Sequence, residues 1–327
     1  MYYNRLLTDD FGRLIAEGGP LRWMFDYVKS HRDLDFQVGR NDQKQWISIY
    51  RGLTRLVTVR PSRKSQELTV DAAPCYKAVS PELFGRKSIS DLGLEPIEKI
   101  RQYLEEQGSK DRHYGNKREG YYQNELSRMY GICGSSDSGF VVVDKEAVVG
   151  YKDTDERNML LGPLQDQYKE LLGKLIKKNP KRYGSKLGSL GNELDFLAVD
   201  QGGNILLVEY KHHGSEIKGI YRSPLQIGLY YEIFSSPQLR SRLQESVLAM
   251  LVQKQEMGLV NAEWKKPELS GKIIPVLIVS EPKAESSAYK KLYEVLTFCR
   301  EERGKSFLED LIMYGYRSEE GLTTLPN

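Results

Sequence analysis

Residues 193–211 read Glu-Leu-Asp-Phe-Leu-Ala-Val-Asp-Gln-Gly-Gly-Asn-Ile-Leu-Leu-Val-Glu-Tyr-Lys, and this stretch decides the fold class. Two runs rich in apolar residues, 194–199 and 205–208, flank a turn at 200–204 whose residues tolerate positive φ. The second run is continuously apolar, as expected of a strand that is covered on both faces. The sequence therefore predicts a β-hairpin within an α/β domain.

Three charged residues stand at the ends of these two runs. Asp195 begins the first run, and Glu209 and Lys211 close the second. Side chains alternate between the faces of a strand, so Glu209 and Lys211 share one face while Tyr210 points to the other. Hairpin pairing places Asp195 beside them. A solvated edge strand would explain a Glu-x-Lys pair without any chemistry, but these runs are too apolar for surface strands.

The three charged residues match the needs of metal-assisted phosphodiester chemistry. Two carboxylates with water provide the hard oxygen ligands that Mg²⁺ prefers. A bound Mg²⁺ polarises a phosphoryl oxygen and helps to generate hydroxide. A lysine ammonium orients that water and stabilises the charge that develops on the phosphoryl group.

A predicted helix over residues 225–234 follows the hairpin, and Pro224 can open it. Gln226 and Tyr230 are four residues apart and therefore share one face. An amide and a phenol on one face can reach a phosphate or a metal-bound water. The alternative is that Tyr230 belongs to the core and Gln226 is a partly buried helix residue.

Asp195, Glu209-x-Lys211 and Gln226-x-x-x-Tyr230 together resemble the PD-(D/E)XK nuclease superfamily. The last element is similar to its RecB-type and lambda-exonuclease-like branches. Glu-Leu-Asp at 193–195 and Val-Glu-Tyr-Lys at 208–211 are similar to its Holliday-junction-resolvase-like branch. The resemblance covers about residues 160–315 in the order of elements.

The resemblance implies a restriction-endonuclease-like core, which is a mixed sheet flanked by helices. It implies Asp195 and Glu209 as ligands of Mg²⁺ or Mn²⁺, Lys211 as the catalytic lysine, and substrate positioning by Gln226 and Tyr230. The residue before Asp195 is Leu194 rather than the proline of the motif, a departure that the superfamily often tolerates. Many members also take an acid from the first core helix, which is predicted over residues 164–176. Here the available acids are Asp166 and Glu170, and a solvated helix face explains them equally well.

Two basic segments are candidates for phosphate contact. Residues 174–186 contain six Lys or Arg and no acid, and we expect Lys178, Lys181 and Arg182 to bind the nucleic-acid backbone. Residues 31–64 contain eight Lys or Arg against three Asp, and the aromatic residues among them suit base stacking. Solvated faces and core aromatics are the alternative. The aromatic residues are Phe36, Trp46 and Tyr50.

Composition limits the class of protein. The 327 residues suffice for two domains, and the net charge of +3 requires any nucleic-acid partner to use local basic patches. No run of eighteen apolar residues and no signal-peptide pattern is present, so we expect a cytoplasmic protein without a membrane partner. Three widely spaced cysteines predict no disulfide framework and exclude a four-cysteine metal or iron–sulfur site.

The sequence predicts a boundary near residue 152. Residues 1–152 form an α+β N-terminal domain for substrate recognition or partner docking, with strands at 35–38, 46–50, 53–60 and 67–71 and a hairpin at 139–150. Residues 151–158 are expected to be a linker or loop. Residues 153–327 form the nuclease-like domain. Its remaining elements are a helix at 239–256, a strand at 272–280, a helix at 286–303 and a strand at 307–316.

The favoured interpretation is a metal-dependent deoxyribonuclease that acts in repair and recombination or in defence and restriction. An RNA-directed nuclease stays open, because nothing in the sequence reads the 2′-hydroxyl. A catalytically silent nucleic-acid-binding or scaffold protein is the alternative from another class. A homodimer would suit an enzyme that cuts two strands. His212 and His213 are expected to be exposed loop residues. The alternative is that one of them faces the site, as an acid for the leaving oxygen or as a metal ligand.

Overall fold

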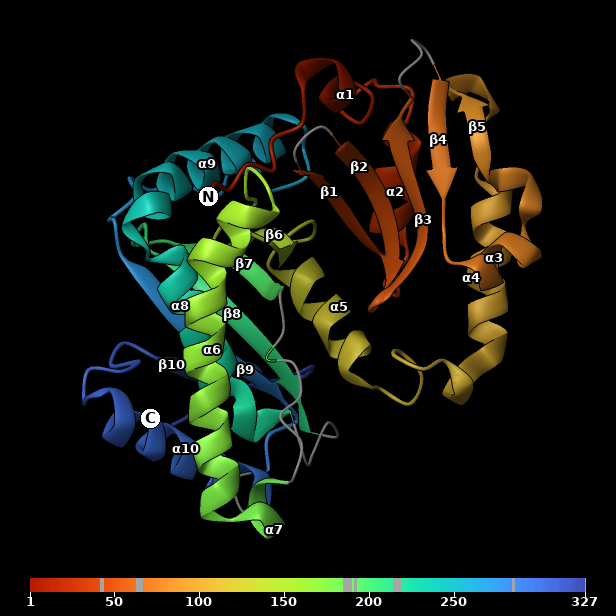
Figure 1. Cartoon of the computed structure of the whole chain (residues 1–327). Coiled ribbons are helices and arrows are strands. Elements are labelled where there is room, and N and C mark those ends of the chain that lie inside the picture. Colours follow the sequence, from red (N-terminus) through yellow and green to blue (C-terminus); the bar gives the residue numbers. More distant parts are fainter. Residues whose placement is uncertain are drawn as a thin grey trace. The chain divides into compact units, whose positions relative to one another are not determined.

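The computed structural model describes residues 1–41, 44–62, 67–184, 190, 193–213, 219–283 and 286–326, and Figure 1 shows its elements. The chain forms two compact units. The C-terminal unit consists of Met1–Tyr3, Lys145–Glu245 and Pro267–Asn327, and the N-terminal unit consists of Asn4–Asp144 and Ser246–Lys266. The sequence-based boundary lies at 152–153, whereas these units divide between Asp144 and Lys145 and again within helix α9 (Pro237–Glu256).

A six-stranded mixed sheet has the order β11–β10–β9–β8–β7–β6, and all of it except residues 140–144 of β6 belongs to the C-terminal unit. Strands β8, β9 and β10 are parallel, while β7 and β11 run antiparallel to their neighbours β8 and β10. The α/β class with a mixed sheet is therefore confirmed. The bounds are β6 (Phe140–Ala147), β7 (Leu194–Asp200), β8 (Ile205–His212), β9 (Ile273–Ser280), β10 (Ile312–Arg317) and β11 (Gly321–Thr324).

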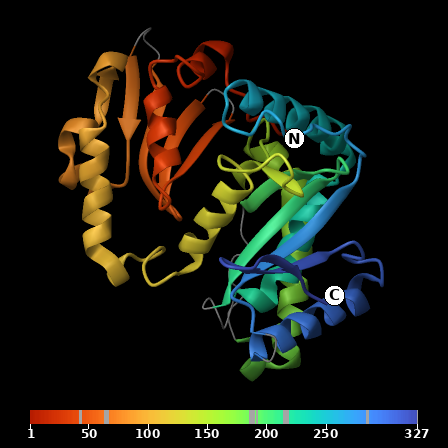
Figure 2. The same ribbon diagram turned by 180° about the vertical axis from the view of Figure 1, so that it is seen from behind.

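Three helices form a layer against this sheet: α6 (Thr154–Lys178), α8 (Ser223–Phe234) and α10 (Ser287–Arg303). Helix α8 packs on β8 and β9, and α6 and α10 both contact α8. Figure 1 shows α6 in front of the strands, and the view from behind in Figure 2 shows the strands first. This unit also contains a short helix, α7 (Pro180–Tyr183), a 3₁₀ turn, η5 (Ile220–Arg222), and the first part of α9, up to Glu245.

One carboxylate joins the three helices of this layer. Glu232 Oε1 accepts hydrogen bonds from the Tyr168 phenol and from Arg303 Nη2, both at 2.6 Å. Tyr168 belongs to α6, Glu232 to α8 and Arg303 to α10. Burial and the neighbouring Glu232 charge raise the pKa of Tyr168, so the phenol remains a donor. The position of α8 over the sheet is thus fixed from both sides.

Helix α6 begins earlier than predicted. Residues 151–158 are not a linker, because α6 starts at Thr154, where the Asp153 side chain caps it by accepting from Glu156 N at 2.8 Å. The predicted helix at 164–176 lies inside α6. The predicted hairpin at 139–150 is also wrong, since residues 140–147 form the single strand β6.

The N-terminal unit contains a five-stranded antiparallel sheet in sequence order, β1 to β5. The four predicted strands are confirmed, and a fifth follows them. The bounds are β1 (Asp35–Asn41), β2 (Lys44–Arg51), β3 (Thr54–Pro61), β4 (Glu67–Asp71) and β5 (Gly85–Ser88). The helices are α1 (Asp9–Arg13), α2 (Arg22–Ser30), α3 (Pro74–Val79), α4 (Glu95–Gln107) and α5 (Glu119–Met129), with 3₁₀ turns η1 (Pro81–Leu83), η2 (Ile89–Asp91) and η3 (Gly108–Lys110).

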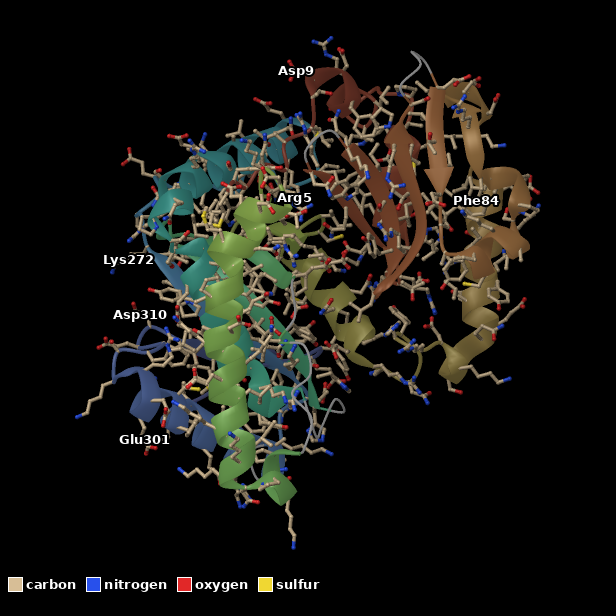
Figure 3. The ribbon with its side chains drawn as sticks, viewed as in Figure 1. Arg5, Asp9, Phe84, Lys272, Glu301 and Asp310 are labelled. Carbon is tan, nitrogen blue, oxygen red and sulfur yellow. The ribbon has the colours of Figure 1, made fainter. Side chains whose placement is uncertain are left out.

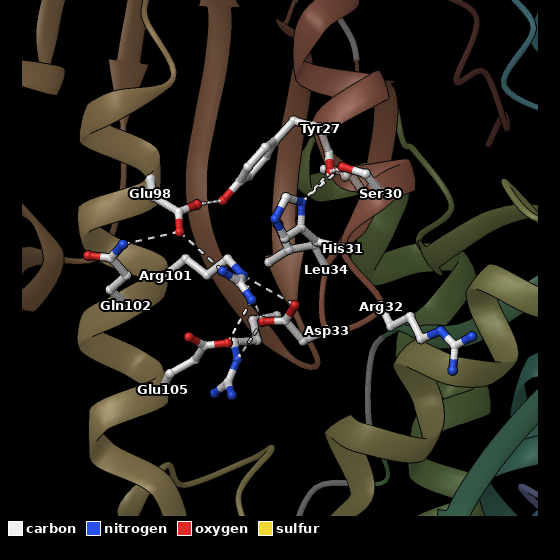
Figure 4. A network of polar contacts seen from close by, with 12 residues as sticks. Tyr27, Ser30, His31, Arg32, Asp33, Leu34, Glu98, Arg101, Gln102 and Glu105 are labelled. Atoms are coloured by element: carbon white, nitrogen blue, oxygen red, sulfur yellow. Dashed lines mark hydrogen bonds and ion pairs between the residues drawn. The ribbon is translucent and has the colours of Figure 1, made fainter.

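A polar network ties α2 and α4 of this unit together (Figure 4). Arg101 on α4 donates to Asp33 at 3.2 Å and to Glu98 and Glu105 on its own helix. The Tyr27 phenol on α2 is hydrogen-bonded to Glu98. Burial together with the Glu98 charge raises the pKa of Tyr27, so its hydroxyl stays protonated at neutral pH.

The surface of the C-terminal unit is rich in charged side chains such as Lys272, Glu301 and Asp310, all of which are exposed (Figure 3). Among the described residues, no helix is long and apolar enough to cross a bilayer. The three cysteines are free thiols: Cys75 and Cys133 are exposed and Cys299 is buried.

The close approach of α8 to its neighbours predicts a stability effect at Gly228. A Cβ at this position would lie 2.6 Å from Phe307 Cζ and 2.8 Å from the Tyr168 hydroxyl oxygen. We expect Gly228→Ala to lower the free energy of unfolding by about 1–3 kcal/mol, because overpacking displaces these side chains. Urea denaturation followed by circular dichroism measures the change.

Gly162→Ala in α6 is the matched control, since a Cβ there has no neighbouring atom within 4 Å. It should stabilise the protein by about 0.5–1 kcal/mol, because alanine favours a helix interior over glycine. Equal effects of the two substitutions would contradict the close contact at Gly228.

Candidate active site

The hairpin formed by β7 and β8 carries the site. The strands pair antiparallel from Phe196 opposite Val208 to Val199 opposite Ile205. Asp200 closes the turn by accepting hydrogen bonds from Asn204 N at 2.9 Å and Asn204 Nδ2 at 2.8 Å. The predicted hairpin is confirmed.

Gly203 is required in this turn for two reasons. Its φ is +77°, in the left-handed region that favours glycine, and a Cβ would lie 1.9 Å from the carbonyl oxygen of Glu268. The turn fixes the register of the strands, and the register decides which side chains meet at the far end of the hairpin.

The two acids and the lysine converge at that end. The paired register ends at Phe196 and Val208, and Asp195 and Glu209 are the next residues along the two strands. Asp195 Oδ2 accepts a hydrogen bond from Tyr210 N at 2.7 Å, and Lys211 Nζ lies 2.5 Å from Glu209 Oε1. The Tyr210 ring packs edge-on against Phe196 with centroids 6.4 Å apart, as alternation along β8 requires.

Burial makes the pairing of Glu209 with Lys211 essential. Glu209 is 1% exposed, and the Lys211 side chain is 12% exposed. An ionised carboxylate in such surroundings is costly without a nearby cation. Asp195 is only half-buried, so its carboxylate remains accessible beside this pair.

Helix α8 brings Tyr230 to the carboxylates. The Tyr230 phenol is 3% exposed and donates to the carbonyl oxygen of Glu193 at 2.8 Å. Burial, followed by the negative charges of Glu209 and Asp195, raises the pKa of Tyr230. Tyr230 is therefore a core residue and a protonated donor near the acids at the same time.

Gln226 lies one turn before Tyr230 and is half-buried. Within the described part of the chain, its side chain forms no hydrogen bond or ion pair. Its amide is therefore available to a ligand, while any contact with phosphate stays a prediction.

Tyr230 also lines a cavity of about 260 Å³ whose walls are largely apolar. Arg157 and Gln165 on α6 are polar members of the wall, and Leu229 and Phe234 on α8 are apolar ones. The walls of this cavity come from the end of β6, the first half of α6 and α8, and no local sequence pattern connects these segments, so the sequence does not predict the cavity.

The two histidines after Lys211 are not exposed loop residues. His212 is the last residue of β8, and both His212 and His213 are half-buried. Strand alternation places His212 on the face opposite Glu209 and Lys211. Burial, with a smaller contribution from His213, lowers the pKa of His212, so its imidazole is neutral at pH 7.

Asp195 and Glu209 could bind a divalent cation only if water or substrate oxygens supply the remaining ligands. Among the described residues, no group of three or more His, Cys, Asp or Glu side chains could hold a metal ion. Asp195 and Glu209 supply two carboxylates, which is the number that Mg²⁺ commonly uses together with waters and phosphate oxygens.

The two acids of helix α6, Asp166 and Glu170, do not join Asp195 and Glu209 as candidate metal ligands. The side chains of Asp166 and Glu170 are 76% and 68% exposed, and they pair along α6 with Lys169 at 3.2 Å and Lys174 at 3.3 Å. The alternative of a solvated helix face is therefore correct for both acids.

Several cations of the segment 174–186 already have partners. Lys174 Nζ is 2.9 Å from Glu302, and Arg182 Nη2 is 2.5 Å from Glu294, both on α10. Lys178 Nζ lies 5.6 Å from the centre of the Phe298 ring. Lys177, Lys178 and Lys181 are exposed and face solvent, whereas Lys186 is outside the described residues.

The aromatic residues of the segment 31–64 differ in their availability for base stacking. Phe36 and Tyr50 are buried, and the Arg5 guanidinium covers Trp46 at 5.2 Å from the ring centre. Burial excludes Phe36 and Tyr50 as base-stacking groups, and the alternative of core aromatics holds for both. Trp46 is half-buried, and its role in stacking stays a prediction.

No family model, curated protein or solved structure matches this chain. The interpretation of the site therefore depends on its own geometry.

The lowered pKa of His212 predicts a pH-dependent stability. The unfolded chain binds a proton near pH 6.5, whereas the folded chain binds it only at lower pH. The free energy of unfolding should therefore decrease as the pH falls through this interval. His212→Asn removes this contribution, so its loss of stability between about pH 7.5 and about pH 5.5 should be smaller than that of the wild type.

Urea unfolding of both proteins at the two pH values measures the difference. If wild type and His212→Asn lose the same stability, the imidazole is not buried in its neutral form.

Proposed function

We propose that this protein is a metal-dependent nuclease that hydrolyses DNA phosphodiester bonds. The observation that supports the proposal best is the convergence of Asp195, Glu209 and Lys211 at one end of the β7–β8 hairpin. Mixed α/β architecture and a flanking helix that presents Tyr230 to the acids agree with it.

Each residue has a defined task in this proposal. Asp195 and Glu209 would hold Mg²⁺ or Mn²⁺, and the hydrogen bond from Tyr210 N keeps the Asp195 carboxylate in place. When bound, the cation would polarise a phosphoryl oxygen and lower the pKa of a water. Lys211 orients the attacking water and stabilises the negative charge that develops on the phosphate. The half-buried Gln226 amide would position the substrate, whereas the buried Tyr230 phenol, which donates to the Glu193 carbonyl, would support the strand that carries Asp195.

The complete set of two acids and a lysine favours catalysis over silent binding. A protein that only binds nucleic acid has no requirement for a carboxylate buried beside a lysine, and a buried pair is weak support for stability. DNA is the proposed substrate, and RNA is the second candidate within the same chemistry.

We expect the purified protein to cleave at least one of linear, nicked, branched or single-stranded DNA in the presence of Mg²⁺ or Mn²⁺. Asp195→Asn and Lys211→Met should each reduce the rate by about 100-fold to 1000-fold, because each removes a group that acts on the reacting phosphate. EDTA should abolish cleavage, and excess Mg²⁺ should restore it.

Asp166→Asn and Lys169→Met are matched controls, since they make the same substitutions on the exposed face of α6. Circular dichroism verifies that all variants are folded. Equal cleavage by wild type, Asp195→Asn and Lys211→Met would refute the catalytic assignment. DNA binding without cleavage of any substrate would favour the silent-binding alternative, and cleavage of RNA alone would favour the second substrate.

The exposed lysines near α7 predict a salt effect on DNA binding. Each phosphate contact contributes about 0.9 to the slope of log K against log salt concentration. Lys178→Gln combined with Lys181→Gln should therefore reduce this slope by about 1–2. Fluorescence anisotropy with labelled DNA in EDTA measures it, and Lys169→Gln is the control. An unchanged slope would exclude these two lysines from the contact.

A further inference from the structure

The N-terminal unit contains a cavity of about 630 Å³ that is separate from the residues of the proposed nuclease site. Its walls come from β3, from the start of α3, from the end of α4 and from the loop that follows η3. The volume falls within the range of about 300–1,000 Å³ that small-molecule and cofactor sites occupy.

Positive charge dominates the walls of this cavity. Four of the lining residues are permanently cationic, and two are acids. Asp71 is paired with Lys77 at 2.6 Å, and Asp111 is paired with Arg51, and neither of these cations lines the cavity. The lining cations are Arg55, Arg60, Lys110 and Arg112.

Three of these cations have no counter-ion among the residues that the structure describes. Within the part of the chain that the structure describes, Arg55, Lys110 and Arg112 form no ion pair, and all three are exposed at the cavity. Arg60 lies 3.7 Å from Asp71, which a closer lysine already neutralises. Guanidinium groups present planar donor pairs that match phosphate oxygens.

Aromatic and hydroxyl groups complete the cavity. The Tyr76 phenol is 8% exposed and is hydrogen-bonded to Thr54, and both residues line the cavity. Tyr103 on α4 also lines the cavity, and it is partly exposed while packing against the hydrophobic core of the unit. His113 also lines the cavity, and burial together with the Arg112 charge lowers its pKa, as expected in positive surroundings.

We propose that this cavity binds a phosphate monoester attached to a nucleotide, with Arg55 and Arg112 holding the phosphate and Tyr103 stacking on the base. Both a free mononucleotide and the phosphorylated end of a nucleic-acid strand present this chemistry. The site is independent of the proposed nuclease activity, since none of its residues belongs to the β7–β8 hairpin or to α8.

Isothermal titration calorimetry of the full chain in EDTA tests the proposal, because binding is then measured without hydrolysis. The probes are inorganic phosphate, AMP, phosphotyrosine, and a short oligodeoxynucleotide with and without a 5′-phosphate. We expect AMP to bind more tightly than inorganic phosphate and phosphotyrosine. Tight binding of AMP identifies a free nucleotide as ligand, whereas preference for the 5′-phosphorylated oligonucleotide identifies a strand end.

Variants locate the binding to this cavity. Arg55→Gln and Arg112→Gln should each weaken AMP binding about tenfold or more, as expected for loss of a charge-assisted hydrogen bond. Tyr103→Leu should weaken the binding of AMP but leave the binding of inorganic phosphate unchanged. Arg86→Gln on β5 makes the same exchange at an exposed position outside the cavity and should have no effect.

Three results would overturn the proposal. They are the absence of binding of every phosphate probe by the wild type, equal binding of AMP by wild type and both arginine variants, and equal affinity for AMP and phosphotyrosine. Nuclease activity of the same preparation is assayed separately, so failure here leaves the proposed function untouched.

Discussion

The β7–β8 hairpin contains a buried carboxylate whose charge must be compensated. Glu209 is 1% exposed, and the ammonium of Lys211, two residues further along the same strand, lies 2.5 Å from it. Removing one member of a buried pair leaves an uncompensated charge, at a cost of about 3–5 kcal/mol. Because Glu209 and Lys211 both lie on β8, the strand itself brings the compensating positive charge to the buried carboxylate. Asp195 is not needed for this compensation, and it is half-buried where Glu209 is fully buried.

The packing behind the sheet determines what meets these charges. Glu232 holds α8 to α6 and α10, and the missing side chain at Gly228 lets α8 approach Tyr168 and Phe307 closely. From this position the Tyr230 hydroxyl donates to the carbonyl oxygen of Glu193, and the negative charges of Glu209 and Asp195 raise the pKa of Tyr230. Strand register and helix packing therefore both fix the positions of these side chains. Groups held in place in this way are effective in catalysis.

Local patterns carried the correct predictions. The turn at 200–204 and the alternation of side chains around Glu209 are set by residues a few positions apart. The sequence therefore predicts the hairpin and the shared face of Glu209 and Lys211 correctly. Pro275 is the third residue of β9, before pairing with β10 begins at Val276, as expected of a residue without a backbone N–H. The cations of 174–186 could not be sorted in this way, because Glu294 and Glu302, which neutralise two of them, lie more than a hundred residues further along the chain.

Helix α9 has a consequence for how the two units can be handled. Its first residues belong to the C-terminal unit, and its remainder leads into a segment that returns Met257 and Leu259 to the hydrophobic core of the N-terminal unit. A truncation near residue 150 would therefore remove Met257 and Leu259 from the hydrophobic core of the N-terminal unit. Each unit consists of more than one segment of the chain, so a fragment that ends at one sequence position lacks part of its unit. To express the N-terminal unit alone, residues 4–144 must be joined to residues 246–266.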